Sequence, residues 1–200
     1  MLDALRSFDW KTVREILDEA PQFLNHKDQK GRDYLHTCCM VDLTNYPSLD
    51  VSASVRIADL LIDRGLSVDA PAFELEDWHA TPLWHAISRG HNLVLAAHLL
   101  KRGCNPEHCM WAAAYNDDVG AILLLFRHGA ELDPVYHTDG NTPLMFAVRY
   151  RRYAAAEALM EAGADVDFPG PAGPHDPSCA TGCAGPTGAY SSGTGAKSEG

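Results

Sequence analysis

Histidine and cysteine are the residues of this chain with the clearest potential for chemistry. The 200 residues include ten histidines and six cysteines. Cys104, His108 and Cys109 lie within one short segment, and thiolate and imidazole groups are ligands that zinc prefers. A structural zinc site needs four ligands, and no fourth is evident beside these three. We therefore expect no metal or cofactor, and a regulatory or catalytic metal or thiol site near Cys104–Cys109 stays an alternative interpretation.

Four further histidines are spaced by six, six and seven residues, namely His79, His85, His91 and His98. Such spacing would bring some of them near one face of a single helix. Gly90 marks a turn that separates two helices, so no single helix holds all four histidines. The sequence contains no G-x-S-x-G, H-E-x-x-H or phosphate-binding glycine loop. We therefore predict that the protein is not an enzyme, although a Cys/His pair that meets only in space would leave no local motif.

A recurring pattern of helix signals determines where these residues lie. Thr142-Pro143-Leu144 predicts the first turn of a helix, where proline loses no hydrogen bond. Gly163 predicts the end of a second helix, since glycine tolerates the positive φ required there. A close copy of this pattern opens at Thr81, and degenerate copies open at Asp33 and Met110. A unit that recurs in this way predicts a stacked solenoid rather than a globule with one pocket.

The pattern G-x-T-P-L, then A-A, then L-L-x-x-G-A-D-V-D resembles the ankyrin-repeat family. Helix-ending glycines at positions 65, 103, 129 and 163 are separated by 38, 26 and 34 residues, which scatter around the ankyrin period of about 33. A partial unit opens the chain, with Leu2–Leu5 ending an inner helix and Trp10–Glu19 forming an outer one. The resemblance covers roughly Leu2 to Phe168. It implies an all-α solenoid of helix-turn-helix units with β-turn or finger loops.

The domain organisation follows from where the pattern holds. We expect an ankyrin-repeat domain of about five units over residues 1–168, with a turn-rich insertion around 42–55. The finger at Pro71–Trp78 is longer than the family pattern, and the one at Gly103–His108 is shorter, which predicts a notch beside it. Residues 169–200 form a Gly/Pro/Ser-rich tail without Leu, Ile, Val, Met or Phe, so we expect this tail to be disordered.

The net charge limits the kinds of partner that we expect, and the placement of the cysteines indicates a cellular compartment. The formal net charge is −11, which argues against a nucleic acid or an anionic membrane surface as partner. No apolar run approaches the length of a membrane span, and the N-terminus does not resemble a secretory signal. Cys38 and Cys39 are adjacent at small-residue positions of a helix, as buried free thiols would be. We expect a cytoplasmic monomer.

The resemblance also implies a function, because partners of ankyrin proteins usually bind in a concave groove formed by the fingers and inner helices. We therefore predict a protein–protein interaction module that binds another protein through its concave face. The positions that match the groove are Asp77, Trp78, Ala80, Ser88, Arg89, Glu107, Tyr115, Asn116, Thr138, Asp139, Asn141, Arg149 and Tyr150. Trp, Tyr and Arg are the types enriched in binding hot spots. We assign Trp84 and Trp111 to the core instead, and His36 to a structural hydrogen bond.

Overall fold

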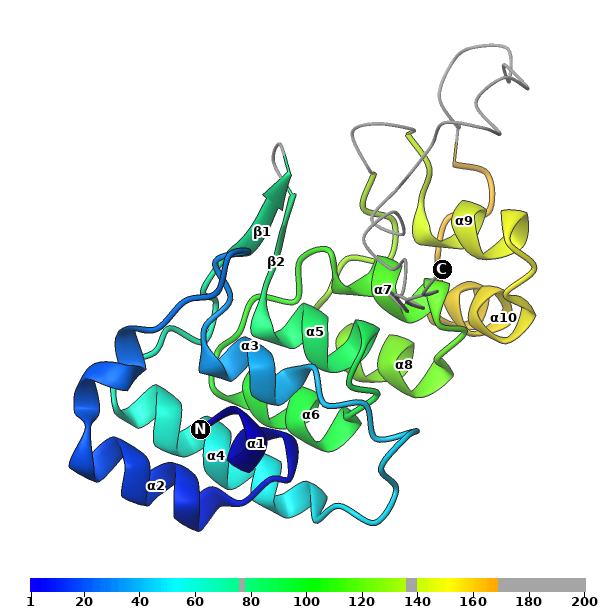
Figure 1. Ribbon diagram of the computed structural model, residues 1–200. Helices are drawn as coiled ribbons and strands as arrows, with labels where there is room; N and C mark the ends of the chain where they lie inside the picture. The colour runs from blue at the N-terminus through cyan, green and yellow to red at the C-terminus, as the bar shows by residue number, and fades with distance from the viewer. Residues whose placement is uncertain (76–77, 136–139, 169–200) are drawn as a thin grey trace, which may run out of the picture. The chain divides into compact units, whose positions relative to one another are not determined.

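The computed structural model describes residues 1–75, 78–135 and 140–168, and in this part the chain forms five successive helix pairs and one short hairpin (Figure 1). The first helices of the pairs, here called inner helices, are α1 (Leu2–Arg6), α3 (Tyr34–Cys39), α5 (Pro82–Ser88), α7 (Cys109–Tyr115) and α9 (Pro143–Arg149). The second, or outer, helices are α2 (Trp10–Glu19), α4 (Val51–Asp63), α6 (Leu93–Lys101), α8 (Val119–Arg127) and α10 (Tyr153–Ala162). A 3₁₀ helix, η1 (Pro21–Asn25), follows α2, and strands β1 (Ala72–Leu75) and β2 (Trp78–Ala80) precede α5.

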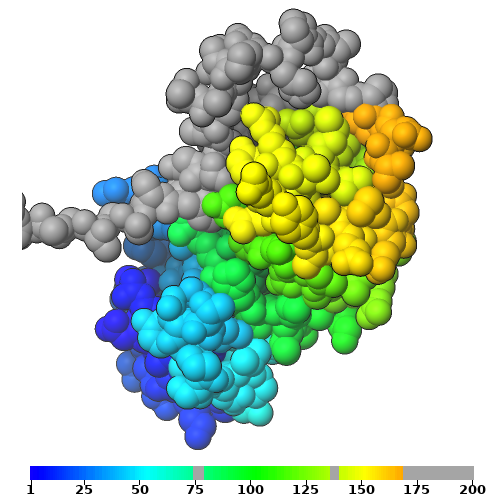
Figure 2. Space-filling model, turned by 90° about the vertical axis from the view of Figure 1, so that its right-hand side faces the viewer, coloured from blue at the N-terminus to red at the C-terminus, as the bar shows by residue number. Residues whose placement is uncertain are grey.

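The helices stack in two rows, as the resemblance implies. Each inner helix packs against the next inner helix, from α1 through α9, and each outer helix packs against the next outer helix, from α2 through α10. Figure 1 shows the two rows, with the last pair, α9 and α10, in yellow and orange. Figure 2 views the stack from the side of this last pair, which faces the reader. The fold is therefore an all-α solenoid in which each pair contacts chiefly its neighbours.

Side-chain caps explain why such short helices begin where they do. Thr81 and Thr142 accept hydrogen bonds from the amides of Trp84 and Met145 at 3.2 and 3.3 Å, and proline follows each threonine. The outer helices α6 and α8 are capped in the same way by Asn92 and Asp118. Each such cap stabilises a helix by about 1 kcal/mol. The predicted helix starts at Thr81 and Thr142 are thus confirmed.

The core lies between the two rows and repeats from pair to pair. Every inner helix contributes at least one large apolar side chain that is at most 6% exposed, such as Leu5, Leu35, Leu83, Met110 and Leu144. The outer helices contribute residues four apart that are at most 1% exposed, such as Val13 with Leu17, Ile57 with Leu61, and Leu95 with Leu99. A spacing of four places both members on one helix face. Small residues such as Ala86, Ala113 and Ala147 let neighbouring inner helices approach closely.

Two glycines show why the chain turns where the pattern predicts. Gly163 ends α10 with a φ of 101°, a left-handed conformation that side chains disfavour. Gly90 lies so close to the backbone of α3 that a β-carbon there would stand 2.3 Å from the carbonyl oxygen of Cys39. The turn between α5 and α6 therefore packs directly on the preceding pair, and only glycine fits.

The insertion in the second pair is shorter than the sequence suggests. We predicted it around residues 42–55, but α4 begins at Val51 because Asp50 caps the helix by accepting the amide of Ser52 at 2.9 Å. The irregular segment is therefore residues 40–50. It is anchored to the next pair by a hydrogen bond from the amide of Leu43 to the carbonyl oxygen of Gly90 at 3.1 Å.

The long finger forms an antiparallel hairpin. Ala72 in β1 pairs with Ala80 in β2, and Leu75 pairs with Trp78, with an irregularity in between. Phe73 donates its amide to the carbonyl oxygen of Lys30 at 2.9 Å, which ties the hairpin to the preceding loop. The finger that follows α6 is replaced by a short turn at residues 102–108, as the sequence predicts.

Leu144 tests the register of the last inner helix. Leu144→Ala should lower the free energy of unfolding by about 2–5 kcal/mol, because Leu144 is 6% exposed and the truncation leaves a cavity. Urea denaturation followed by circular dichroism measures the change. Val148→Ala on the same helix is the matched control, since Val148 is 60% exposed and its truncation should have little effect. Equal effects of the two variants would show that the assignment of Leu144 to the buried face of α9 and of Val148 to its exposed face is wrong.

Candidate functional site

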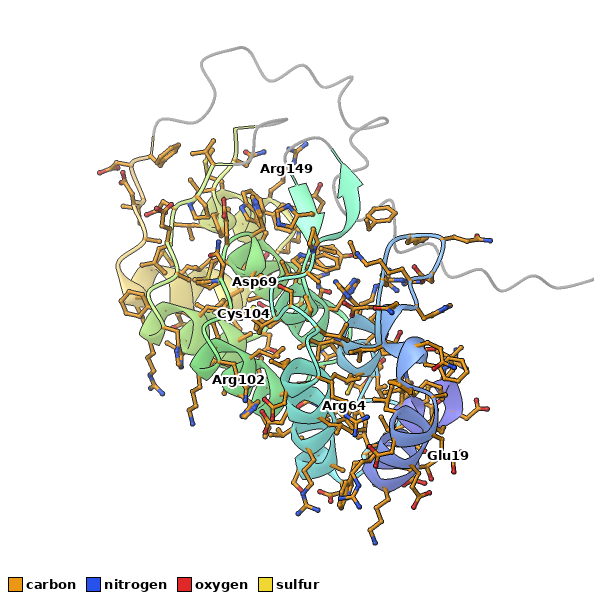
Figure 3. All side chains as sticks on the ribbon, turned by 90° about the vertical axis from the view of Figure 1, so that its left-hand side faces the viewer. Glu19, Arg64, Asp69, Arg102, Cys104 and Arg149 are labelled. Carbon is orange, nitrogen blue, oxygen red and sulfur yellow. The ribbon has the colours of Figure 1, made fainter. Side chains whose placement is uncertain are left out.

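The candidate surface lies where three inner helices end. Helices α5, α7 and α9 have Ser88, Tyr115 and Arg149 as their last residues, and Arg89, Asn116 and Tyr150 as their C-caps. Because the three helices pack side by side, these six residues form one row, which we call the inner-helix row. The structure thus brings together the three residue pairs that the sequence singled out. Figure 3 shows Arg149 on the side toward the hairpin, with Arg64 and Arg102, which cap the outer helices α4 and α6, on the opposite side.

Exposure increases along the inner-helix row toward α9. Ser88 is only 5% exposed, and its hydroxyl is buried without a hydrogen-bond partner among the described residues. Arg89, Tyr115 and Asn116 are half-buried. Arg149 is exposed, and Tyr150 is 47% exposed. The part of the row that is open to a partner therefore lies at α7 and α9, and Ser88 is a correction to the predicted set.

Asn116 serves the stack rather than the surface. Its side-chain amide donates to the carbonyl oxygens of Ile87 and Ser88 at 3.0 and 3.2 Å. These carbonyls belong to the last turn of α5, where no further amide of that helix can reach them. The next residue, Asp117, makes a similar contact in the other direction, because its carboxylate accepts the amide of Ala155 in α10 at 2.7 Å. The α7–α8 turn therefore holds both neighbouring pairs.

Four aromatic residues of α7 and α9 form a continuous group, which we call the aromatic cluster: Trp111, Tyr115, Phe146 and Tyr150. The Phe146 ring lies at its centre, with ring centroids 5.5 Å from Trp111, 6.0 Å from Tyr115 and 4.4 Å from Tyr150. Trp111, Tyr115 and Phe146 are each half-buried. Aromatic pairs at such distances contribute about 0.5–1.5 kcal/mol each. The cluster is therefore an ordered apolar platform that remains partly open.

Two arginines that follow one another closely at the end of α9 contact rings of the aromatic cluster. The guanidinium of Arg149 lies 5.9 Å from the centre of the Tyr150 ring, and that of Arg152 lies 5.3 Å from the Tyr115 ring. Arg151 is exposed and has a φ of 57°. We call residues 149–152 the basic turn. Contacts of this kind between a cation and an aromatic face are worth about 0.5–1 kcal/mol at exposed sites.

Several predicted residues lie elsewhere. Ala80 is 1% exposed and Asn141 is 7% exposed, so both are buried and neither presents a side chain to a partner. Asp77, Thr138, Asp139 and the side chain of Trp78 lie outside the described residues. Glu107 is exposed and accepts a hydrogen bond from the Asn105 side chain at 3.1 Å.

The sequence reasoning missed part of the surface. Trp84 is 4% exposed, as predicted for a core residue, but Trp111 is half-buried and belongs to the aromatic cluster. Phe146 and Arg152 were not predicted at all. A usable signal was present, because Trp111–Tyr115 and Phe146–Tyr150 are each four residues apart, which places each pair on one helix face.

The alternative site near Cys104–Cys109 does not have the features of a reactive centre. Cys104 and Cys109 are buried, and the Cys104 thiol donates to a carboxylate oxygen of Asp69 at 2.8 Å. Burial, followed by the hydrogen bond to Asp69, raises the pKa of the Cys104 thiol, and burial likewise raises the pKa of Cys109. Both thiols are therefore protonated at neutral pH, whereas nucleophilic attack requires a thiolate. Among the described residues, no three His, Cys, Asp or Glu side chains gather as metal ligands.

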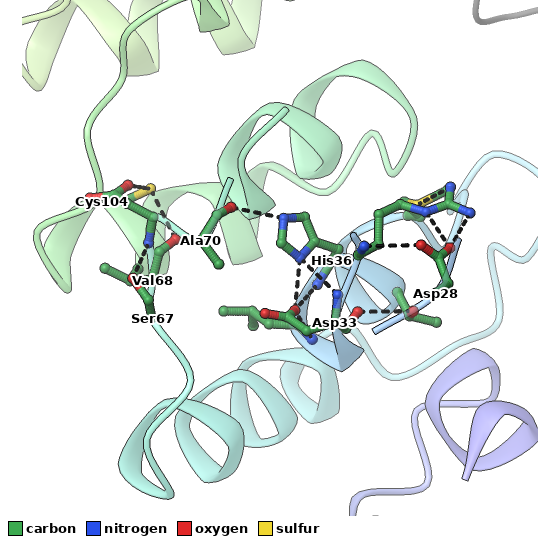
Figure 4. A network of polar contacts seen from close by, with 12 residues as sticks. Asp28, Asp33, His36, Ser67, Val68, Ala70 and Cys104 are labelled. Atoms are coloured by element: carbon green, nitrogen blue, oxygen red, sulfur yellow. Dashed lines mark hydrogen bonds and ion pairs between the residues drawn. The ribbon is translucent and has the colours of Figure 1, made fainter. Parts of the chain in front are cut away.

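His36 has the structural role that the resemblance implies. Its Nδ1 lies 2.7 Å from the Asp33 carboxylate, and its Nε2 lies 2.9 Å from the carbonyl oxygen of Ala70 in the next loop (Figure 4). Burial opposes ionisation of Asp33, but hydrogen bonds from His36 and from the amide of Leu35 outweigh it and lower the pKa of Asp33. The charged Asp33 thus orients the His36 ring, and the opposite side of that ring bonds to Ala70 across the boundary between two repeats. Figure 4 also shows Cys104 in contact with the loop at Val68.

His85 is a second buried histidine, without such partners. Its ring contacts Trp84 and His36 at centroid distances of 5.1 and 5.7 Å, and neither ring nitrogen has a hydrogen-bond partner among the described residues. Burial, and after it the charge of His36, lowers the pKa of His85 well below its ordinary value. His85 is therefore a neutral core residue that is closed to substrates.

A cavity of about 400 Å³ opens near the N-terminus between α1, α3 and the insertion. Its lining includes Arg6, Asp28, Arg32, Asp42 and Tyr46. Arg32 is engaged by Asp28 through Nε at 2.7 Å, so the positive charge is locally neutralised. The mixed lining of two arginines and two aspartates favours no single class of ligand.

Comparison with known proteins supplies the family of these repeats. A family model described as ankyrin repeats in three copies matches residues 95–169. The chain is 38% identical over 73 residues to Inversin from Gallus gallus and 39% identical over 69 residues to Inversin from Homo sapiens. These alignments cover 36% and 34% of this chain but only 7% and 6% of the two relatives, so the chain spans a small part of their length.

The predicted resemblance and the solenoid fold class are confirmed by these matches and by the helix pairs. Ankyrin repeats are generally protein–protein interaction modules, and such proteins are typically non-catalytic. Among the described residues, no helix combines the length and apolar character needed to cross a bilayer.

Substitution of Asn116 tests whether this residue of the inner-helix row stabilises the stack, in contrast to the exposed residues of the row. Asn116→Ala should lower the free energy of unfolding by about 1–3 kcal/mol, since two carbonyls at the end of α5 lose their donor. Arg149→Ala, an exposed member of the same row, should change it by less than about 1 kcal/mol, the value of its contact with the Tyr150 ring. Chemical denaturation of both variants measures the difference, and an unchanged midpoint for Asn116→Ala would contradict this assignment.

Proposed function

This chain is an ankyrin-repeat protein, and we propose that it binds another protein through its inner-helix row and the aromatic cluster beside it. The single observation that carries the proposal is the open aromatic cluster between α7 and α9, with Tyr150 47% exposed. The core of each pair is built from leucine, alanine and similar residues, so packing does not require large aromatic side chains at the helix ends. Tyr, Trp and Arg are also the residues that most often dominate protein interfaces.

The proposed role is binding without catalysis. The buried, protonated thiols of Cys104 and Cys109 and the neutral, enclosed His85 support this view, because each lacks the ionisation or access that chemistry requires. A cytoplasmic location is part of the proposal. It is supported by the cysteines that the structure describes, Cys38, Cys39, Cys104 and Cys109, which are all free and buried and suit a reducing compartment.

The test begins with a partner captured from a native cell extract and then purified. Tyr150→Ala and Arg149→Ala should each weaken binding of that partner by about 1–4 kcal/mol, as expected for anchors near a contact centre. Titration calorimetry measures the affinity, and circular dichroism verifies the fold of each variant.

Lys101→Ala and Arg127→Ala are the matched controls, because both residues are exposed and end outer helices, α6 and α8. They should leave binding nearly unchanged. If the outer-helix variants abolished binding while Tyr150→Ala and Arg149→Ala bound as tightly as the parent, the proposal would fail.

A further inference from the structure

The basic turn stands out against the charge of the whole chain. The protein has a formal net charge of −11, yet Arg149, Arg151 and Arg152 fall within four consecutive residues with no acidic residue among them. Among the described residues, none of these three arginines forms an ion pair. By contrast, Arg32, Arg64 and Arg102 each pair with aspartate. The basic turn is therefore a local concentration of positive charge that the described protein does not neutralise.

Stacking, rather than hydrogen bonding, positions these guanidinium groups. Arg152 lies over Tyr115 at 5.3 Å, and its buried Nε has no hydrogen-bond acceptor among the described residues. Arg149 lies near Tyr150 at 5.9 Å. An arginine that stacks on an aromatic face can keep the N–H groups at the end of its guanidinium available in the plane of the group, where they match a carboxylate. The ring contacts therefore hold the two guanidinium groups in place without neutralising their charge.

The aromatic cluster joins the two stacked arginines into one surface. Contacts run from Arg149 to Tyr150, from Tyr150 to Phe146, from Phe146 to Tyr115, and from Tyr115 to Arg152: a continuous series with an apolar centre and a cation at each end. Inner helices lie about 8–10 Å apart, and an extended chain advances about 3.3 Å per residue. About three residues of an extended peptide therefore span the distance from α7 to α9, and a peptide of six residues extends beyond both helices.

We propose that the basic turn and the aromatic cluster bind a short acidic segment of a partner protein. The carboxylates of the segment pair with Arg149, Arg151 and Arg152, and an aromatic or aliphatic side chain of the segment rests on Phe146 and Tyr150. This inference rests on the proposed protein-binding function and names the chemistry of the partner. A long polyanion such as single-stranded RNA fits less well, because it would extend from this small basic area over a chain that is otherwise strongly acidic.

The test measures binding of fluorescent peptides to the full chain by anisotropy. The probe is Glu-Asp-Glu-Phe-Asp-Glu, and the comparison peptides replace its acids by lysine or its phenylalanine by alanine. The acidic probe should bind, its affinity should fall as salt is added, and the lysine peptide should not bind. The alanine peptide should bind less tightly than the probe, since it cannot occupy the aromatic cluster.

Two double variants with equal loss of charge make the result specific. Arg149→Gln with Arg151→Asn should weaken binding of the acidic probe at least about tenfold, and asparagine suits the positive φ of residue 151. Lys101→Gln with Arg127→Gln removes the same charge from the outer helices and should change binding by less than about twofold. Thermal melting of both double variants verifies that they fold as the parent does.

The outcomes separate this inference from the proposed function. Failure of the acidic probe to bind, or equal loss in both double variants, overturns the acidic-segment inference, and the proposed function stands if a captured partner still depends on Tyr150. Tighter binding of a single-stranded oligouridine than of the acidic peptide, lost in the Arg149/Arg151 variant, would replace the inference by RNA binding. Loss of both peptide binding and Tyr150 dependence would remove both proposals.

Discussion

The structure depends on one constraint: no helix pair of this chain can bury its apolar face alone. Short helices such as α3 and α9 bury leucine against the neighbouring pairs, and polar contacts cross the same boundaries. His36 reaches the carbonyl of Ala70, and Asn116 reaches the carbonyls at the end of α5. Each pair thus completes the hydrogen bonds and the core of the next, which is the nearest-neighbour coupling of a repeat protein.

The same constraint explains where a binding surface can form. Packing and hydrogen bonding occupy the faces between pairs, so Ser88 and Asn116 are committed to the stack although the sequence places them in the inner-helix row. The aromatic cluster and the basic turn are not fully used by contacts between the helix pairs, and part of their surface stays exposed. In the proposed binding mode, the stack holds these side chains in place before a partner arrives, which reduces the entropy lost on binding.

The sequence alone was sufficient for features that are local or periodic. The helix starts at Thr81 and Thr142 and the helix end at Gly163 follow from signals within one repeat, and all three are present. The burial of Ala80 and Asn141, the start of α4 at Val51 and the partial exposure of Trp111 did not follow. These depend on which neighbour lies against each residue, and an insertion or a shortened finger changes that neighbour without changing the pattern within a repeat.

The central claim is that recognition takes place at α7 and α9 on the inner side of a preformed stack. Amide hydrogen exchange of the full chain, with and without a purified partner, tests it most directly, because protection reports where a partner restricts local opening. The account predicts slower exchange in residues 109–117 and 143–153 in the complex, with α2 and α4 unchanged. Protection confined to the outer helices, or to the N-terminal pairs, would contradict it.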